Sequence, residues 1–172
     1  MVMSAKQLLI CVVLLALVGC GEPTNTHSAP ATCPQDDFLV EVQQYLPAAT
    51  FVNTTWEPSP GTDLEAAINA GGAACSYGIQ EAEIGTTILW AEGSELFASR
   101  SAQWEKDGYQ LVNVDGVDEG WALFEETEVE QHLWVVNLLV ESVWIQVNAT
   151  FLSDLEEAQD LLDAAIAVTK TS

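Results

Sequence analysis

Apolar and polar positions repeat with two different periods along the chain after residue 33, and the first segment has the period of a helix. Residues 34–46 place their apolar side chains on one helical face, and Pro47 ends the segment. We therefore predict an amphipathic helix here. Its apolar positions are Phe38, Leu39, Val42, Tyr45 and Leu46.

Three further segments carry helix signals. Residues 62–72 begin with a capping box, Thr62 and Glu65, and end at two glycines. Residues 94–106 have apolar side chains at helical spacing, and residues 153–170 open with a second capping box, Ser153 and Glu156. We predict helices in the middle and at the C-terminal end of the chain.

Other segments alternate with a period of two, which predicts strands. Short turns separate most of these runs, and consecutive strands joined by short turns pair in an antiparallel manner. We therefore expect an α+β fold, a mostly antiparallel sheet with the N-terminal, middle and C-terminal helices layered on one face. The predicted strands are 49–56, 74–80, 86–92, 109–114, 120–126, 131–142 and 143–151.

The first twenty residues have a different pattern. Lys6 precedes an apolar run over residues 8–18, which spans only about 16 Å as a helix, roughly half of a bilayer core. A cation, a short apolar run and small residues are the layout of a secretory signal.

Residues 17–20, Leu-Val-Gly-Cys, resemble the bacterial lipobox. The resemblance implies that Cys20 receives a diacylglycerol and becomes the new N-terminus after cleavage. We expect a signal peptide over 1–19, a lipidated flexible tether over 20–32 and a single globular domain over 33–172. An ordered arm packed on the domain is the alternative for the tether. The expected location is the extracytoplasmic face of the cell membrane.

Composition restricts the partners. The chain of 172 residues has a formal net charge of −22, and after residue 19 its only Lys and Arg side chains are Arg100, Lys106 and Lys170. Nucleic-acid binding is excluded, because no basic patch can neutralise phosphates. Attraction to anionic headgroups is disfavoured as well, so the lipid has to hold the protein at the membrane. A cationic partner or bound Ca²⁺ is a functional alternative to simple solubility.

Two cysteines remain for the domain, Cys33 and Cys75. In an exported protein such a pair predicts a disulfide, and closing a loop of about 42 residues stabilises the fold by roughly 4 kcal/mol in the chain-entropy model. Catalytic or metal-binding thiols are the alternative, but no further ligands stand at zinc spacing.

A cysteine near a tether followed by a Cys-x-Tyr strand also resembles a family of secreted actinobacterial lipoproteins, with Cys33, Cys75 and Tyr77 as the matching residues. That resemblance implies no enzyme activity, because the function of the family is undefined.

An acidic turn at 113–120 is a candidate Ca²⁺ loop through Asp115, Asp118 and Glu119. The loop lacks EF-hand spacing, and a solvated hairpin turn is the alternative interpretation.

His132 is the only histidine of the predicted domain. A Ser-His-Asp triad would need it, but the chain has no Gly-x-Ser-x-Gly motif, so a histidine at a strand end is the preferred interpretation.

The chain has six tryptophans, and several of them lie on predicted strands. Trp90, Trp134 and Trp144 could line an apolar groove on one face of the sheet. Ordinary core packing is the alternative, since aromatic side chains supply large buried areas.

These observations predict a membrane-anchored lipoprotein that acts as a non-enzymatic binding or envelope-accessory domain without a cofactor. Its expected partners are the membrane, through the lipid, and an unknown protein or hydrophobic ligand. A carrier of a hydrophobic ligand in a Trp-lined groove is one alternative. An envelope enzyme based on acidic residues or Ca²⁺ is another.

Overall fold

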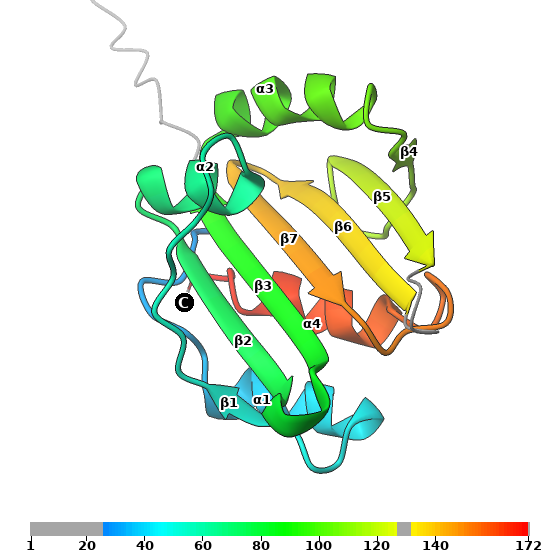
Figure 1. Cartoon of the computed structure of the whole chain (residues 1–172). Helices are drawn as coiled ribbons and strands as arrows, with labels where there is room; N and C mark the ends of the chain where they lie inside the picture. Colours follow the sequence, from blue (N-terminus) through cyan, green and yellow to red (C-terminus); the bar gives the residue numbers. More distant parts are fainter. Residues whose placement is uncertain (1–25, 127–131, 172) are drawn as a thin grey trace, which may run out of the picture.

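The computed structural model describes residues 26–126 and 132–171, which form a seven-stranded antiparallel sheet with four α-helices (Figure 1). The predicted α+β class is confirmed. The strands lie in the order β1-β2-β3-β7-β6-β5-β4. The strands are β1 (Thr50–Val52), β2 (Ala73–Ile79), β3 (Ile84–Glu92), β4 (Gln110–Leu111), β5 (Glu119–Glu126), β6 (His132–Val140) and β7 (Val143–Ala149).

The helices divide between the two faces of the sheet. They are α1 (Asp36–Tyr45), α2 (Asp63–Asn69), α3 (Ser94–Trp104) and α4 (Gln159–Ala167), with a short 3₁₀ turn at Gln80–Ala82. Figure 1 shows α1 and α4 behind the sheet and α2 and α3 at its upper end. The expectation that all helices cover one face is therefore wrong.

The β3 strand shows why both faces are covered. Ile88 and Trp90 pack in a core cluster with α1 and α4, whereas Leu89 and Ala91 pack in a second cluster with α2 and α3. These four consecutive residues are all buried. An uninterrupted buried run is typical of a strand that is covered on both sides. We call the side with Trp90 the core face and the side with Leu89 the open face.

The chain closes the sheet by a long crossover. After β3, α3 carries the chain to the far edge, and the β4–β7 meander then returns until β7 pairs with β3, with Trp90 opposite Ile145. Strands distant in sequence thereby become neighbours at the centre of the sheet.

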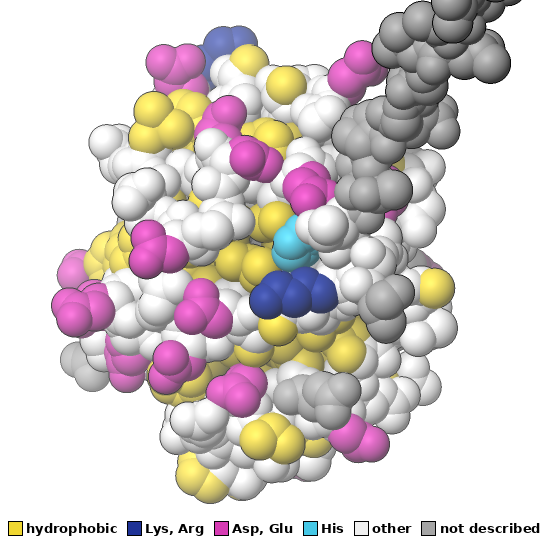
Figure 2. Space-filling model, turned by 180° about the vertical axis from the view of Figure 1, so that it is seen from behind, with side chains coloured by type: hydrophobic (Ala, Val, Ile, Leu, Met, Phe, Trp, Pro, Cys, Tyr) yellow, Lys and Arg dark blue, Asp and Glu magenta, His cyan; other side chains and the backbone are white. Residues whose placement is uncertain are grey.

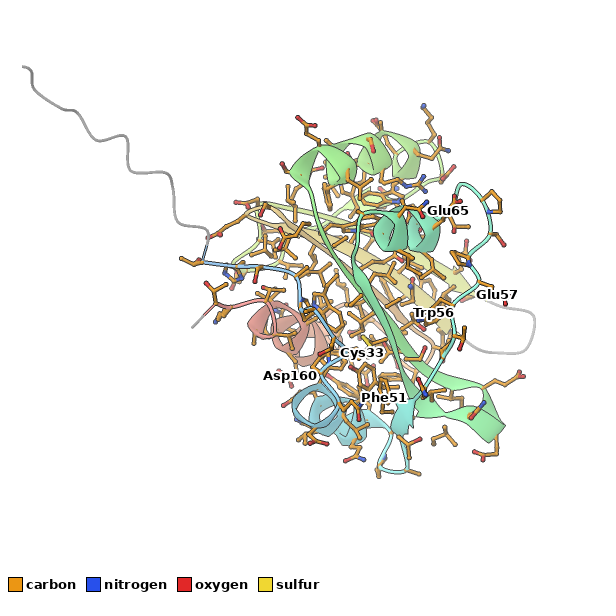
Figure 3. The ribbon with its side chains drawn as sticks, turned by 90° about the vertical axis from the view of Figure 1, so that its left-hand side faces the viewer. Cys33, Phe51, Trp56, Glu57, Glu65 and Asp160 are labelled. Atoms are coloured by element: carbon orange, nitrogen blue, oxygen red, sulfur yellow. A yellow bond between two sulfur atoms is a disulfide. The ribbon has the colours of Figure 1, made fainter. Side chains whose placement is uncertain are left out.

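The predicted disulfide is confirmed, since Cys33 and Cys75 are bonded across a sequence separation of 42 (Figure 3). It fixes the segment before α1 to β2. The Tyr77 hydroxyl donates a hydrogen bond to the Pro34 carbonyl at 2.6 Å in the same place, and burial raises the pKa of Tyr77. The start of α1 is thus held to the sheet by one covalent bond and one buried hydrogen bond.

The predicted tether is wrong from Thr26 onward, because this part of the chain packs on the domain. His27 forms a β-bridge with Lys170, and the Ser28 amide donates to the Thr169 carbonyl at 2.7 Å. The alternative of an ordered arm therefore holds at residues 26–29, which make these contacts, and we call residues 26–32 the arm. Residues 1–25, which include the predicted signal peptide and Cys20, lie outside the described residues. Within the part that is described, no helix has the length and apolarity to cross a membrane.

The two predicted capping boxes behave differently. The Thr62 hydroxyl accepts from the Glu65 amide at 3.2 Å, as expected at the start of α2. Residues 153–158 form turns instead, with the Asp154 carboxylate accepting from the Glu157 amide, and α4 begins only at Gln159. The same residue pattern can thus close a local turn instead of starting a helix, because such side chains also bond to nearby backbone amides outside helices.

Acidic side chains are spread over the surface. Figure 2 shows them scattered across the side that carries α1 and α4, with few Lys or Arg side chains among them.

Candidate functional site

The lower half of the open face has no helix over it. There, a hollow of about 360 Å³ lies beside the β2–β3 hairpin and reaches the ends of β6 and β7. It is the candidate site, because it is a hollow in the part of the open face that no helix covers. The residues that define its floor and walls are Ser76, Gly78, Gly85, Thr87, Leu133 and Asn148.

Two paired glycines leave the floor of the hollow bare. Gly78 lies opposite Gly85 in the β2–β3 ladder. A Cβ atom on Gly78 would lie 2.3 Å from the Ile84 carbonyl oxygen, and one on Gly85 would lie 2.4 Å from the Tyr77 carbonyl oxygen. Neither position tolerates a side chain without a shift of backbone, so the hollow depends on both glycines.

A row of neutral polar side chains crosses three strands above this floor. The hydroxyl groups of Ser76 and Thr87 are 3.1 Å apart and share a hydrogen bond. Thr87 lies opposite Asn148 in the β3–β7 ladder, and the Asn148 Nδ2 donates to Gln146 Oε1 at 3.1 Å. The row therefore offers hydroxyl and amide groups at fixed positions.

A buried hydrogen-bond network supports this row from the covered half of the open face. Gln146 Nε2 donates to Asp63 Oδ2 at 2.8 Å and to Asn137 Oδ1 at 2.9 Å. The indole N–H groups of Trp104 and Trp144 donate to Asp63 at 2.8 Å and to Asn137 at 3.0 Å, respectively. The network joins α2, α3, β6 and β7, so it holds the side chains of the site in one arrangement.

Asp63 is the centre of that network and also pairs with Arg100, the only arginine of the chain. It lies in the first turn of α2, where the helix dipole favours a negative charge. Burial, followed by the nearby Asp63 carboxylate, raises the pKa of Tyr109 to about 12. Sequence reasoning missed Asp63. The spacing of Arg100 and Trp104, one helical turn apart, was the signal that both would face the same partner.

One group in this network has an unused hydrogen-bonding capacity. Asn137 is fully buried, and its Nδ2 has no partner among the described residues. Its Oδ1 accepts two bonds, which fixes the orientation of the amide.

The three tryptophans predicted to share a groove do not share one. Trp90 is buried on the core face and donates to the Ala165 carbonyl of α4 at 3.0 Å. Trp144 is buried on the open face, whereas Trp134 packs against the core face beside Phe124, with ring centroids 4.9 Å apart. The groove hypothesis is wrong, because the register places Trp144 opposite Ala91 and not opposite Trp90, and neighbouring residues of one strand point to opposite faces.

The predicted Ca²⁺ residues bind other parts of the chain. Asp118 Oδ2 accepts from the Glu141 amide at 2.7 Å, and Glu119 Oε1 accepts from the Trp121 indole at 2.6 Å, while Asp115 is exposed. Among the described residues, no group of three or more His, Cys, Asp or Glu side chains could hold a metal ion. The Ca²⁺ loop is therefore not formed.

His132 begins β6 and is exposed, as expected for a histidine at a strand end. Its ring stacks on Phe124 with centroids 5.3 Å apart.

No protein-family model matches the chain, and the search of curated proteins returned no similar protein.

The chemistry of the hollow favours binding. Of the described residues that line it, only Glu83 and Tyr77 can ionise, and the Tyr77 hydroxyl is already bonded to the Pro34 carbonyl. Activation of a nucleophile needs a base within hydrogen-bond reach of it, and the Tyr77 hydroxyl donates to a backbone carbonyl instead. Hydroxyl and amide side chains around an open floor instead suit recognition of a neutral polar ligand.

Proposed function

We propose that this chain is a lipid-anchored, exported, non-enzymatic binding domain whose open face binds a neutral, hydroxyl-rich ligand such as a glycan. The anchor in this proposal is Cys20, at the end of the lipobox-like residues 17–20. The Cys33–Cys75 disulfide supports export, because such bonds persist in oxidising compartments.

The observation that carries the binding role is the uncovered half of the open face. Helices cover the core face, yet the same sheet leaves Ser76, Thr87 and Asn148 half-buried around a bare glycine floor. Polar side chains that a buried network holds in place are preorganised for hydrogen bonding, which lowers the entropic cost of binding.

The ligand class follows from the chemistry of the lining. Sugar hydroxyls exchange hydrogen bonds with side-chain hydroxyls and amides, and the apolar side of a sugar ring can lie on Leu133. The net charge of −22 disfavours an anionic ligand. The separation of the tryptophans removes the main support for a carrier of hydrophobic molecules.

The experiment is an NMR titration of the chain after residue 19, with Cys20→Ser to keep it in solution. The probes are two neutral oligosaccharides, chitotetraose and maltotetraose. We expect amide shifts at Gly78, Gly85 and Asn148 with at least one probe. Thr87→Val should weaken that binding at least fivefold, whereas the matched control Thr55→Val, at an exposed position outside the hollow, should not.

Shifts confined to other surfaces, or none with either probe, would contradict the glycan-binding role. The anchor is tested separately in cells. Cys20→Ser should release the protein from the membrane fraction, and unchanged retention would refute the lipid assignment.

A further inference from the structure

We infer that the end of the domain formed by the β6–β7 turn, the last residue of β3 and the C-terminal residues faces the lipid surface, with the hollow pointing away from it. We call this the latch end. The inference rests on the proposed lipid at Cys20 and adds to it a fixed orientation. It stands on the contacts of the arm, residues 26–32.

Glu141 binds the start of the arm. Its carboxylate accepts hydrogen bonds from the Thr26 amide at 2.8 Å, the Thr26 hydroxyl at 2.6 Å and the His27 amide at 3.2 Å. These bonds lower the pKa of Glu141, the Thr26 hydroxyl being the largest cause. One side chain thus holds two consecutive residues of the arm.

The C-terminal residues hold the arm from the other side. The Thr171 amide donates to the Thr26 carbonyl at 2.9 Å, and the Ser28 amide donates to the Thr169 carbonyl at 2.7 Å. The Thr169 hydroxyl donates to the Ile166 carbonyl, so it accepts from His27 Nδ1, which lies 2.7 Å away. The arm is therefore paired along both of its edges.

A third contact ties the arm to the sheet. The Ala29 amide donates to Glu92 Oε1 at 2.6 Å, and the Ser142 hydroxyl donates to Glu92 Oε2 at 3.1 Å. Glu92 is the last residue of β3 and lies opposite Val143 in the ladder. We call the contacts of the arm with Glu141, the C-terminal residues and Glu92 the latch. The latch joins the arm to two central strands, β3 and β7.

Glu141 has an unusual backbone conformation. Its φ angle is +54°, in the left-handed region that glycine and asparagine occupy most easily. A glutamate there adds strain to a two-residue turn, and its side chain supplies bonds to the arm that a glycine lacks. Glu83 has almost the same φ angle, +55°, at the other end of the sheet, and no arm lies beside it.

The short chain between Cys20 and the latch limits how far the latch end can lie from the lipid. Six residue steps separate Cys20 from Thr26, and they span at most about 22 Å when fully extended. If the arm were free, the first fixed residue would be Cys33, which is up to about 47 Å from the lipid. The latch thus shortens the possible reach by about half and brings one particular end of the domain to the membrane.

The hollow lies at the opposite end. From Glu92 to Ile84, β3 runs about 27 Å toward the β2–β3 hairpin, beside which the hollow is found. A ligand in the surrounding compartment can then reach the open face without obstruction by the bilayer.

The latch end carries charges of both signs. The carboxylates of Glu92, Asp118 and Glu141 all accept hydrogen bonds from N–H or O–H donors there. His27 and Lys170 are bridged at the same place, although basic residues are few in this chain.

The experiment measures the depth of two labels in the full lipidated chain, reconstituted in vesicles of phosphatidylethanolamine and phosphatidylglycerol. Nitroxides are attached at Ser94→Cys, beside the latch end, and at Gln80→Cys, at the hairpin. Relaxation by a Ni²⁺-chelating lipid should be at least threefold stronger at position 94. Glu141→Gly should reduce that ratio toward one, and the control Glu57→Gly, at an exposed loop position outside the hollow, should leave it unchanged.

Equal relaxation at both positions in the native chain, or stronger relaxation at position 80, would overturn the orientation. A ratio that survives Glu141→Gly would overturn the role of the latch. Failure of the anchor itself gives a different result, because the protein would then not float with the vesicles and its N-terminal peptide would lack the mass of the lipid.

Discussion

The two faces of the sheet bury side chains of different chemistry. The core face is packed with aliphatic and aromatic residues against α1 and α4, whereas the covered half of the open face contains a hydrogen-bond network around Asp63 and Asn137. Apolar packing depends on volume, but a buried polar network depends on every partner being present. We therefore interpret the core face as the source of stability and the open face as the part built for specificity.

The largest expected effect comes from comparing one substitution on each face of the same strand. Leu138 and Leu133 both belong to β6, with Leu138 fully buried on the core face and Leu133 half-buried beside the hollow. Leu138→Ala should lower the free energy of unfolding by about 2–5 kcal/mol, because it leaves a cavity in the core. Leu133→Ala should cost under about 1.5 kcal/mol. Urea denaturation of both variants measures the difference, and equal losses would contradict the distinction between the faces.

An intermediate effect is expected in the polar network. Asp63→Asn preserves the shape of the side chain but removes its charge, and it replaces one acceptor by a donor facing Arg100 or Trp104. The loss of stability should be about 1–3 kcal/mol. The same variant should change the NMR signals of the Gln146 and Asn148 side-chain amides, because they are linked to Asp63. Leu161→Ala, in α4 on the core face, is the control, and it should leave those signals nearly unchanged.

If the Asn148 amide kept its native signal in Asp63→Asn, the network would not be the support of the hollow. The comparison would then reduce to two independent packing regions.

The smallest expected effect concerns the latch and depends on pH. The pKa of Glu141 is lowered in the folded protein, chiefly by the Thr26 hydroxyl. The carboxylate therefore stabilises the native state above its ordinary pKa, and this contribution is lost as the pH falls through the lower folded value. Glu141→Gln should unfold at a lower urea concentration than the native chain at pH 7, and this difference should shrink at pH 3. A difference independent of pH would show that the carboxylate charge plays no part in the latch.

Much of the sheet could be predicted because strand periodicity and short turns are local signals. The β6–β7 hairpin, with Glu141 and Ser142 in its turn, follows directly from the sequence pattern. The pairing of β3 with β7 does not, since more than fifty residues separate Trp90 from Ile145 and only packing brings them together. The position of α3 on the open face was missed for the same reason.

The candidate site was less predictable than the fold. The tryptophans attracted attention because of their size, but three of the six, Trp90, Trp104 and Trp144, are fully buried in the packed interior. The residues that form the hollow are small or neutral and carry no motif, and Gly78 and Gly85 become informative only once they are seen opposite each other.

The sequence by itself determined the α+β class, the disulfide between Cys33 and Cys75 and the expectation of a lipid on Cys20. Periodicity, cysteine number and an N-terminal motif are properties of the chain that need no partner. Only the tertiary structure decided which face each helix covers, that Asp63 joins α2 to α3 and β7, and that the arm is bound by Glu141. Those contacts join residues far apart in sequence, and their energies exist only after the sheet has closed.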